Sequence, residues 1–126
     1  QMSRKQKENT FILSPQQWPP LTDCFGVEIE KGDIIVYPLR QQAQMWIAPA
    51  LVRGWQFRKK IDWKDANNEE VYCNLRVWIL SEEDNRQLKP RKTIINSIER
   101  IVKLNPDGIQ NHPKIKALLE MPVEED

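Results

Sequence analysis

The chain has 126 residues, a length that suits one domain and is too short for two ordinary ones. Its formal net charge at pH 7 is only +1, so it lacks the strong overall basicity that is typical of nucleic-acid-binding proteins. No apolar run reaches the ~18 residues needed to cross a bilayer, and the polar start lacks the apolar stretch of a signal peptide. We therefore expect a cytoplasmic protein with no membrane contact.

Residues 1–26 are predicted to form an extended or partly disordered N-terminal arm. The first residues are polar and charged, which is typical of a loosely attached end. Pro15, Pro19 and Pro20 then disfavour a helix and favour an extended path. Trp18 lies among these prolines, and we expect its ring to anchor the arm on the domain that follows.

Residues 27–105 carry the β-strand pattern of the chain. Strands are predicted over residues 34–37, 45–57, 71–80, 91–95 and 101–104. The strand over 71–80 is the clearest, because its residues alternate between an apolar face and a mixed face. The apolar face carries Val71, Cys73, Leu75, Val77 and Ile79, and the mixed face carries Tyr72, Asn74, Arg76 and Trp78.

Turn and breaker residues separate these strands. Gly32 is free to take a positive φ in the turn before the first strand. Pro38 is predicted to end that strand, and Pro49, which cannot donate to a ladder, indicates an edge or a bulge. Residues 58–70 are polar and are predicted to form a charged hairpin connection, while residues 96–100 suit one 3₁₀ turn.

Residues 106–126 are predicted to form a short helix followed by an acidic tail. The helix is expected from Pro113 to Glu120, because proline is well tolerated in the first turn of a helix. Three apolar side chains recur there at helical spacing, and we expect them to bury a modest area: Ile115, Leu118 and Leu119.

Three short motifs within residues 31–104 carry a resemblance to a known group of proteins. Gly32 and Asp33 open a strand, a Tyr-Pro-x-Arg loop starts at Tyr37, and the pattern Thr-x-x-x-x-x-Glu-Arg-x-Val starts at Thr93. With five short strands, a long central pair and a 3₁₀ turn before the last strand, they resemble small SH3-like barrel proteins of bacteriophages and mobile elements. The resemblance implies a mostly β fold with a five-stranded SH3-like barrel over residues 27–105.

We expect no catalytic site, no metal site and no cofactor. The only histidine, His112, lies at the predicted helix start, and Cys73 lies on an apolar strand face, so neither completes a nucleophile–base pair. The second cysteine, Cys24, is widely separated from Cys73, and two such cysteines suggest no zinc framework. A single disulfide between them is one alternative, and we expect instead that both are buried free thiols. The four glycines are scattered singly, so there is no phosphate-binding loop.

Five tryptophans are an unusual number for this length. Trp55 is expected in the core, Trp78 lies opposite the apolar stripe, Trp46 follows a polar loop and Trp63 lies among basic residues. In one interpretation the chain ends pack over these rings and bury them. In the other, some rings stay exposed and anchor an interface, as aromatic side chains beside arginines commonly do.

Basic residues surround the aromatic ones in residues 55–64, and a second basic cluster lies at residues 89–92. Rings among cations suit single-stranded nucleic acid, through base stacking and phosphate contact. The candidate binding residues are Trp46, Arg58, Lys59, Lys60, Trp63, Lys64, Arg76, Trp78, Lys89, Arg91 and Lys92.

Our leading hypothesis is a non-enzymatic binding module that contacts a protein partner; the resemblance implies a phage or mobile-element accessory protein. The second is a nucleic-acid-binding module that uses the basic aromatic hairpin. The third is an inhibitor of host defence that sequesters a nucleotide or blocks a defence protein. A methyl-lysine cage of Tyr37, Trp46 and Tyr72 is a further alternative. An exposed edge strand or the C-terminal helix could also support a homodimer.

Overall fold

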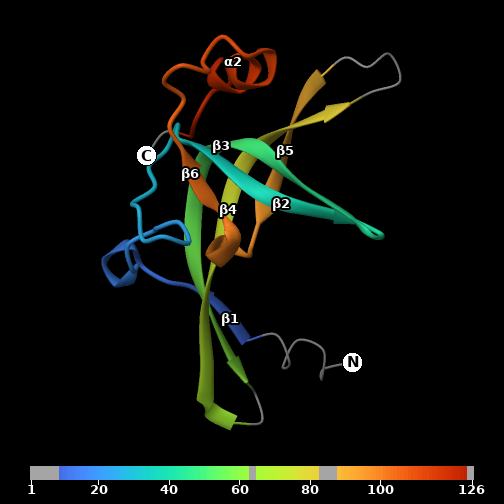
Figure 1. The fold of residues 1–126 in the computed structure, drawn as a ribbon. Coiled ribbons are helices and arrows are strands. Elements are labelled where there is room, and N and C mark those ends of the chain that lie inside the picture. Colours follow the sequence, from blue (N-terminus) through green and yellow to red (C-terminus); the bar gives the residue numbers. More distant parts are fainter. Residues whose placement is uncertain (1–8, 63–64, 83–87, 125–126) are drawn as a thin grey trace.

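The computed structural model describes residues 9–62, 65–82 and 88–124. The chain is mostly β, with one short helix near its C-terminal end (Figure 1). In chain order the elements are β1 (Asn9–Ile12), η1 (Pro15–Gln17), β2 (Ile34–Gln41), β3 (Gln44–Asp62), β4 (Asp65–Glu82), β5 (Leu88–Ile95), η2 (Ile98–Arg100), β6 (Val102–Leu104) and α2 (Pro113–Leu119).

The strands form one antiparallel sheet in the order β5-β4-β3-β2-β6, and β1 is added beside β3. The two central strands are long, with 19 residues in β3 and 18 in β4. Their length lets one edge of β3 serve two neighbours, β2 along residues 44–51 and β1 along residues 58–61. β4 covers the other edge of β3 and pairs in turn with β5 through residues 75–82.

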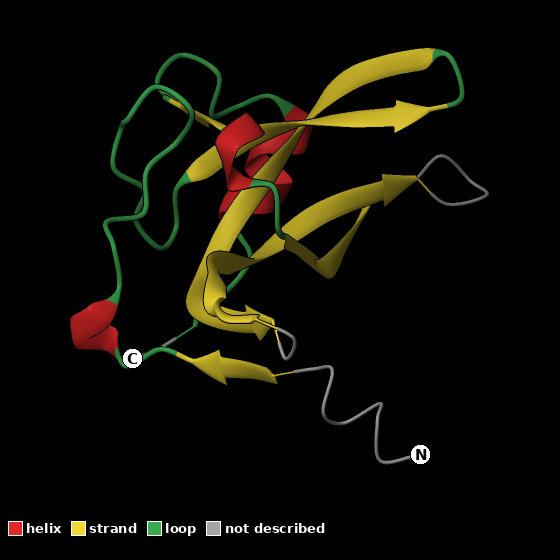
Figure 2. Cartoon of the chain, turned by 90° about the horizontal axis from the view of Figure 1, so that it is seen from below, coloured by secondary structure: helices red, strands yellow, loops and turns green. Residues whose placement is uncertain are grey.

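The sheet is open. β5 and β6 lie at its two ends, and no pairing joins them within the part of the chain that the structure describes. Figure 2 shows the far ends of the β2–β3 hairpin and of β4 diverging instead of closing on each other. The expected closed barrel of five strands is therefore not confirmed, because the sheet has six strands and two open ends.

Several stretches predicted to be loops are strand. Residues 58–62 and 65–70, expected in a charged connection, extend β3 and β4, because β1 and β4 supply backbone partners on the two edges of β3. Pro38 does not end the first strand and lies inside β2, opposite Ile47. β6 pairs with β2 only along residues 34–36, so Pro38 lies at a sheet edge, where a residue without an N–H is tolerated.

Two of the predicted turn elements are confirmed. Gly32 has a φ of 89°, and η2 forms the single 3₁₀ turn expected before the last strand. Pro49 lies one residue before the pairing of β3 with β4 begins. It is therefore paired with β2 on one side and lies at a sheet edge on the other. The register shift in β3 falls later, between Val52 and Gly54.

The main core lies on one face of the sheet. Ile35, Val52 and Val77 are among its fully buried residues. The segment before β2 also contributes, since Leu21 and Ile29 are buried in the same cluster. The core is therefore built from the strands, from η2 and its flank, and from part of the predicted arm.

Trp18 anchors the arm as predicted. Its ring lies 5.9 Å from that of Phe57 between centroids, and its indole N–H donates to the Leu13 carbonyl at 2.8 Å. Asp23 makes a second attachment, because its buried carboxylate accepts hydrogen bonds from the backbone N–H groups of Phe25, Val27 and Lys103. Burial alone raises the pKa of Asp23, but these hydrogen bonds outweigh it and hold the pKa below its ordinary value.

The helix α2 is confirmed and packs at the other side of β2 and β3. Ile115 and Leu118 are buried there with Ile34 and Leu51 in a second, smaller cluster. The prediction that Leu119 is buried is wrong, because this residue is 41% exposed. In a helix of seven residues only one stripe faces the sheet, and Leu119 lies beside it.

Candidate functional site

The β2–β3 hairpin ends in an apolar tip. We call residues 38–47 the hairpin tip; Figure 1 shows it projecting away from the rest of the molecule. Three consecutive apolar side chains are exposed on it: Met45 is 69% exposed, Trp46 43% and Ile47 70%. Isolated exposed apolar residues are common on proteins, whereas contiguous exposed apolar residues are typical of interaction surfaces.

The register of the hairpin gives its two faces different surroundings. Met45 lies opposite Arg40 and Ile47 opposite Pro38, so these four residues share one exposed face. Trp46 lies opposite Leu39 on the other face, where Leu39 packs against the main core. One face of the tip therefore carries apolar side chains and an arginine, and the opposite face carries the indole ring of Trp46.

A groove of about 890 Å³ lies where β4 and β5 separate. Beyond the pair formed by Leu75 and Ile95, the chain turns away into η2. No strand then pairs with residues 69–74 of β4 on the side away from β3, as far as the described residues show. We call this the edge groove.

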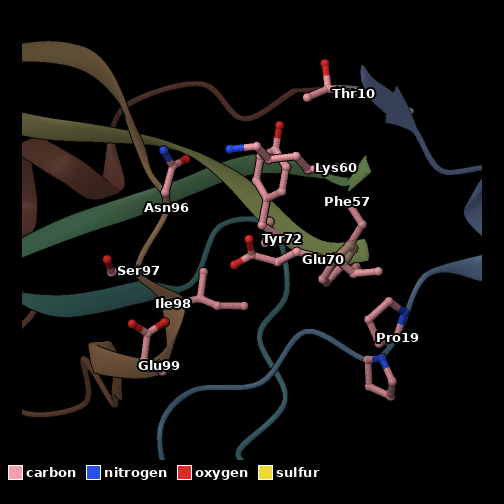
Figure 3. Close-up of a pocket in the computed structure, with 13 residues that line it drawn as sticks. Thr10, Pro19, Phe57, Lys60, Glu70, Tyr72, Asn96, Ser97, Ile98 and Glu99 are labelled. Atoms are coloured by element: carbon pink, nitrogen blue, oxygen red, sulfur yellow. The ribbon is translucent and has the colours of Figure 1, made fainter. Parts of the chain in front are cut away.

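Figure 3 shows what surrounds the edge groove. Tyr72, Lys60 and Glu70 come from the long strand pair, Asn96 to Glu99 lie across from them, and the proline segment closes one end. Cys73 lies at the buried base of the groove. Burial raises the pKa of its thiol to about 12. A thiol with so high a pKa stays protonated at neutral pH, so Cys73 is a poor nucleophile. Cys24, expected to be buried, is an exposed free thiol.

The basic segment 58–60 lies beside acidic residues of β4. Lys59 Nζ lies 2.8 Å from Glu69 Oε2, and Arg58 Nη2 donates to Thr10 Oγ1 at 3.4 Å. Lys60 lies opposite Glu70 in the register. Trp63 and Lys64 lie outside the described residues. The strand pairing therefore offsets part of the positive charge that the sequence places there.

The second basic cluster divides between the two faces of β5. Lys92 Nζ lies 5.3 Å from the centroid of the Trp78 ring, on the outer face. Arg91 lies on the opposite face with Lys89, and its charge opposes the rise that burial causes in the pKa of Tyr37. Both Lys89 and Arg91 are exposed.

The two basic clusters do not form one surface. Lys59 lies opposite Val71, and Lys92 lies opposite Trp78, seven residues farther along β4. At 3.3 Å per residue these positions are roughly 23 Å apart along the strand.

Arg76 and Trp78 lie under the C-terminal end of the described chain. Glu124 accepts hydrogen bonds from Arg53 Nη2 at 2.9 Å and from Arg76 Nε at 2.8 and 2.9 Å. The Trp78 indole N–H donates to the Pro122 carbonyl at 2.8 Å. Hydrogen bonds from Arg76, then the charges of Arg76 and Arg53, hold the pKa of Glu124 below its ordinary value despite burial. We call Arg53, Gly54, Arg76 and Trp78 the tail clamp.

Arg53 of the tail clamp and Glu124, the residue that it binds, were not identified from the sequence. They are 71 positions apart, so no local pattern relates them. The only available signals were the acidic end of the chain and the arginine before Gly54.

Tyr37, Trp46 and Tyr72 do not form an aromatic cage. Tyr37 is buried in the core, Trp46 lies at the hairpin tip and Tyr72 lines the edge groove. The ring contact found among the described residues joins Trp18 and Phe57. His112 caps α2 by accepting a hydrogen bond from the Lys114 N–H.

Within the described ranges, no three His, Cys, Asp or Glu side chains gather in a metal-binding arrangement. None of the helices described there is long and apolar enough to span a membrane. Comparisons with known protein families, curated proteins and solved structures give no match for this chain.

Proposed function

We propose that this protein is a non-enzymatic binding module that docks its hairpin tip on another protein. The observation that carries the proposal is the exposed run Met45, Trp46 and Ile47 beside Arg40. Tryptophan, methionine and arginine are enriched at protein interfaces, and tryptophan and arginine dominate their hot spots. Apolar side chains on a projecting tip gain free energy when a partner removes them from water.

The backbone of the hairpin supports the same function. β2 and β3 stay in register from Ile34–Leu51 out to Gln41–Gln44, and Gln42 takes a φ of 56° in the tight turn. A paired hairpin is ordered before it binds, so docking loses less conformational entropy than ordering a loop would.

A second proposal concerns the fold of the protein. We propose that the open sheet is a relative of the small SH3-like barrel. It is supported by the strand order β6-β2-β3-β4-β5 and by the 3₁₀ turn η2 between β5 and β6.

Binding to nucleic acid or to a nucleotide has weaker support. The two basic clusters are separated along β4, and Lys59 is paired with Glu69. The edge groove is large enough for a nucleotide, but its described lining residues include Glu70 and Glu99 and one cation, Lys60. Phosphate groups would meet more negative than positive charge there.

Photo-crosslinking tests the proposed function. A benzophenone amino acid at position 45 should crosslink to one defined protein in cells of the source organism. The same group at Phe25, which is 77% exposed and distant in sequence from the tip, is the matched control. Loss of the product when I47S is added to the chain that carries the probe at position 45 would support docking by the tip. Equal crosslinking from positions 45 and 25, or from neither, would contradict it.

A further inference from the structure

The tail clamp has the features of a peptide-binding site. The register shift between Val52 and Gly54 puts Gly54 opposite Arg76 and brings Arg53 beside it. A Cβ at position 54 would lie 2.6 Å from Glu124 Oε2 and 3.0 Å from Arg76 Nη2. The absence of a side chain at Gly54 therefore makes room for the carboxylate and the guanidinium together.

The tail clamp contacts both the backbone of residues 122–124 and the side chain of Glu124. Arg76 Nη2 lies 2.7 Å from Glu124 Oε2, which adds to the bonds from Arg76 Nε and Arg53. The Glu124 N–H donates to the Arg53 carbonyl at 3.1 Å, and Trp78 donates to the Pro122 carbonyl. Arginine–carboxylate pairs of this kind combine charge with directional hydrogen bonds.

The bound segment itself is only lightly buried. Pro122 is exposed, Val123 is 40% exposed and the Glu124 side chain is 31% exposed. Its attachment therefore depends on a few polar contacts that salt and competitors can reach, with little apolar burial behind them.

The cationic surface extends beyond this segment. A cleft of about 540 Å³ adjoins the tail clamp and is lined by Arg53, Arg76, Lys92, Thr93 and Ile94. Lys92 and Arg53 both lie near the Trp78 ring, at 5.3 and 5.8 Å from its centroid. A longer acidic peptide could thus make contacts that residues 122–124 do not make.

We propose that the tail clamp is an exchangeable site for an extended acidic peptide of a partner protein, with a proline two residues before a glutamate. In the free protein, residues 122–124 occupy the site and act as an intramolecular competitor. The tail clamp and the hairpin tip share no residue, so this inference does not depend on the proposed function.

Residues 122–124 should weaken the binding of an added peptide by a factor that depends on their effective concentration. A short tether gives its segment an effective concentration in roughly the millimolar range. If the intrinsic dissociation constant of the segment is about 100 µM, it weakens a competing peptide about tenfold. Removing the competitor without disturbing the site should restore that factor.

The experiment measures binding of a labelled peptide, Met-Pro-Val-Glu-Glu-Asp, to the full chain by fluorescence anisotropy. E124Q should bind the peptide about tenfold more tightly than the wild type, because its own tail loses the carboxylate. E120Q is the matched control, since Glu120 is exposed at the end of α2, and it should bind like the wild type. A peptide with glutamine at its fourth position should bind none of these proteins measurably.

Variants of the site itself keep the test decisive. R76Q in the E124Q background should abolish binding. G54A in the same background should weaken it, because the added methyl group would displace the Arg76 guanidinium and the carboxylate of the peptide. Wild-type affinity in E124Q, or unchanged binding in E124Q/R76Q, would overturn the proposal. A concentration-dependent dimer that E124Q abolishes would also overturn it, by assigning the occupant to a second copy of this chain.

Discussion

The two ends of β3 both extend from the body of the protein, and they differ in what surrounds them. At the hairpin tip, residues 44–49 pair only with β2, and Met45 and Ile47 are exposed. At the other end, residues 58–61 are paired on both edges, by β1 and by β4. Lys59 there forms an ion pair with Glu69. The charged end has its partners within the chain, whereas the apolar end exposes surface that another molecule can cover.

The largest expected effect comes from the point where β3 leaves the body for the charged end. Phe57 is 3% exposed and packs against Trp18 there. Phe57→Ala should lower the free energy of unfolding by about 3–5 kcal/mol, through lost burial and the cavity left behind. Urea denaturation measures the loss. Trp46→Ala, at the exposed end, is the contrast and should cost under about 1 kcal/mol. Similar losses in both variants would remove the distinction between the two ends.

The second prediction concerns partner binding at the apolar end. M45S/I47S should weaken binding of the crosslinked partner by about 2–4 kcal/mol, the size of an interface hot spot. The free energy of unfolding should change by no more than about 0.5 kcal/mol, because both side chains are on the surface. Isothermal titration calorimetry and thermal denaturation report the two quantities. A folded double variant that keeps full affinity would show that the tip does not carry binding.

A third prediction addresses the body that joins the two ends. Asp23→Asn should cost about 1–3 kcal/mol at pH 7, because the N–H of Lys103 would face an amide group in place of a carboxylate oxygen. The folded-state pKa of Asp23 lies below its ordinary value of 3.8, so its carboxylate stabilises the fold above that pH. This stabilisation is lost as the pH falls through the lowered pKa.

Denaturation of both proteins over a range of pH checks this sign. The stability gap between the wild type and Asp23→Asn should be constant near neutral pH and should narrow below about pH 4. A gap that widens on acidification would mean that burial, and not the hydrogen bonds, dominates the pKa of Asp23.

The smallest effect is expected at the charged end itself. Charge reversal at either residue of the Lys59–Glu69 pair should cost about 0.2–1 kcal/mol, since both side chains are partly exposed. The double swap K59E/E69K should recover most of the loss, and 0.5 M salt should reduce the difference. A double-mutant cycle measures the coupling. Zero coupling would show that the ion pair does not stabilise this end of β3, which would then depend on its backbone pairing with β1 and β4.

Much of the local structure followed from the sequence alone. Alternation over residues 71–80 predicted a strand with Cys73 and Val77 facing the core, and both are buried in it. Gly32 and Pro113 marked a turn and a helix start that the structure confirms. These features depend on the preferences of a few neighbouring residues, which a short window of sequence contains.

Only the tertiary structure decided what lies against each surface. Residues 58–62 look like a polar connection until β1 and β4 supply their backbone partners. Trp78 was correctly placed on the face opposite the apolar stripe, but its cover, Pro122, is 44 positions away. The open sheet and the exposure of Cys24 likewise depend on which distant segments meet. Periodicity shows which face of a strand is apolar, but long-range pairing determines which segment covers that face and which faces remain in water.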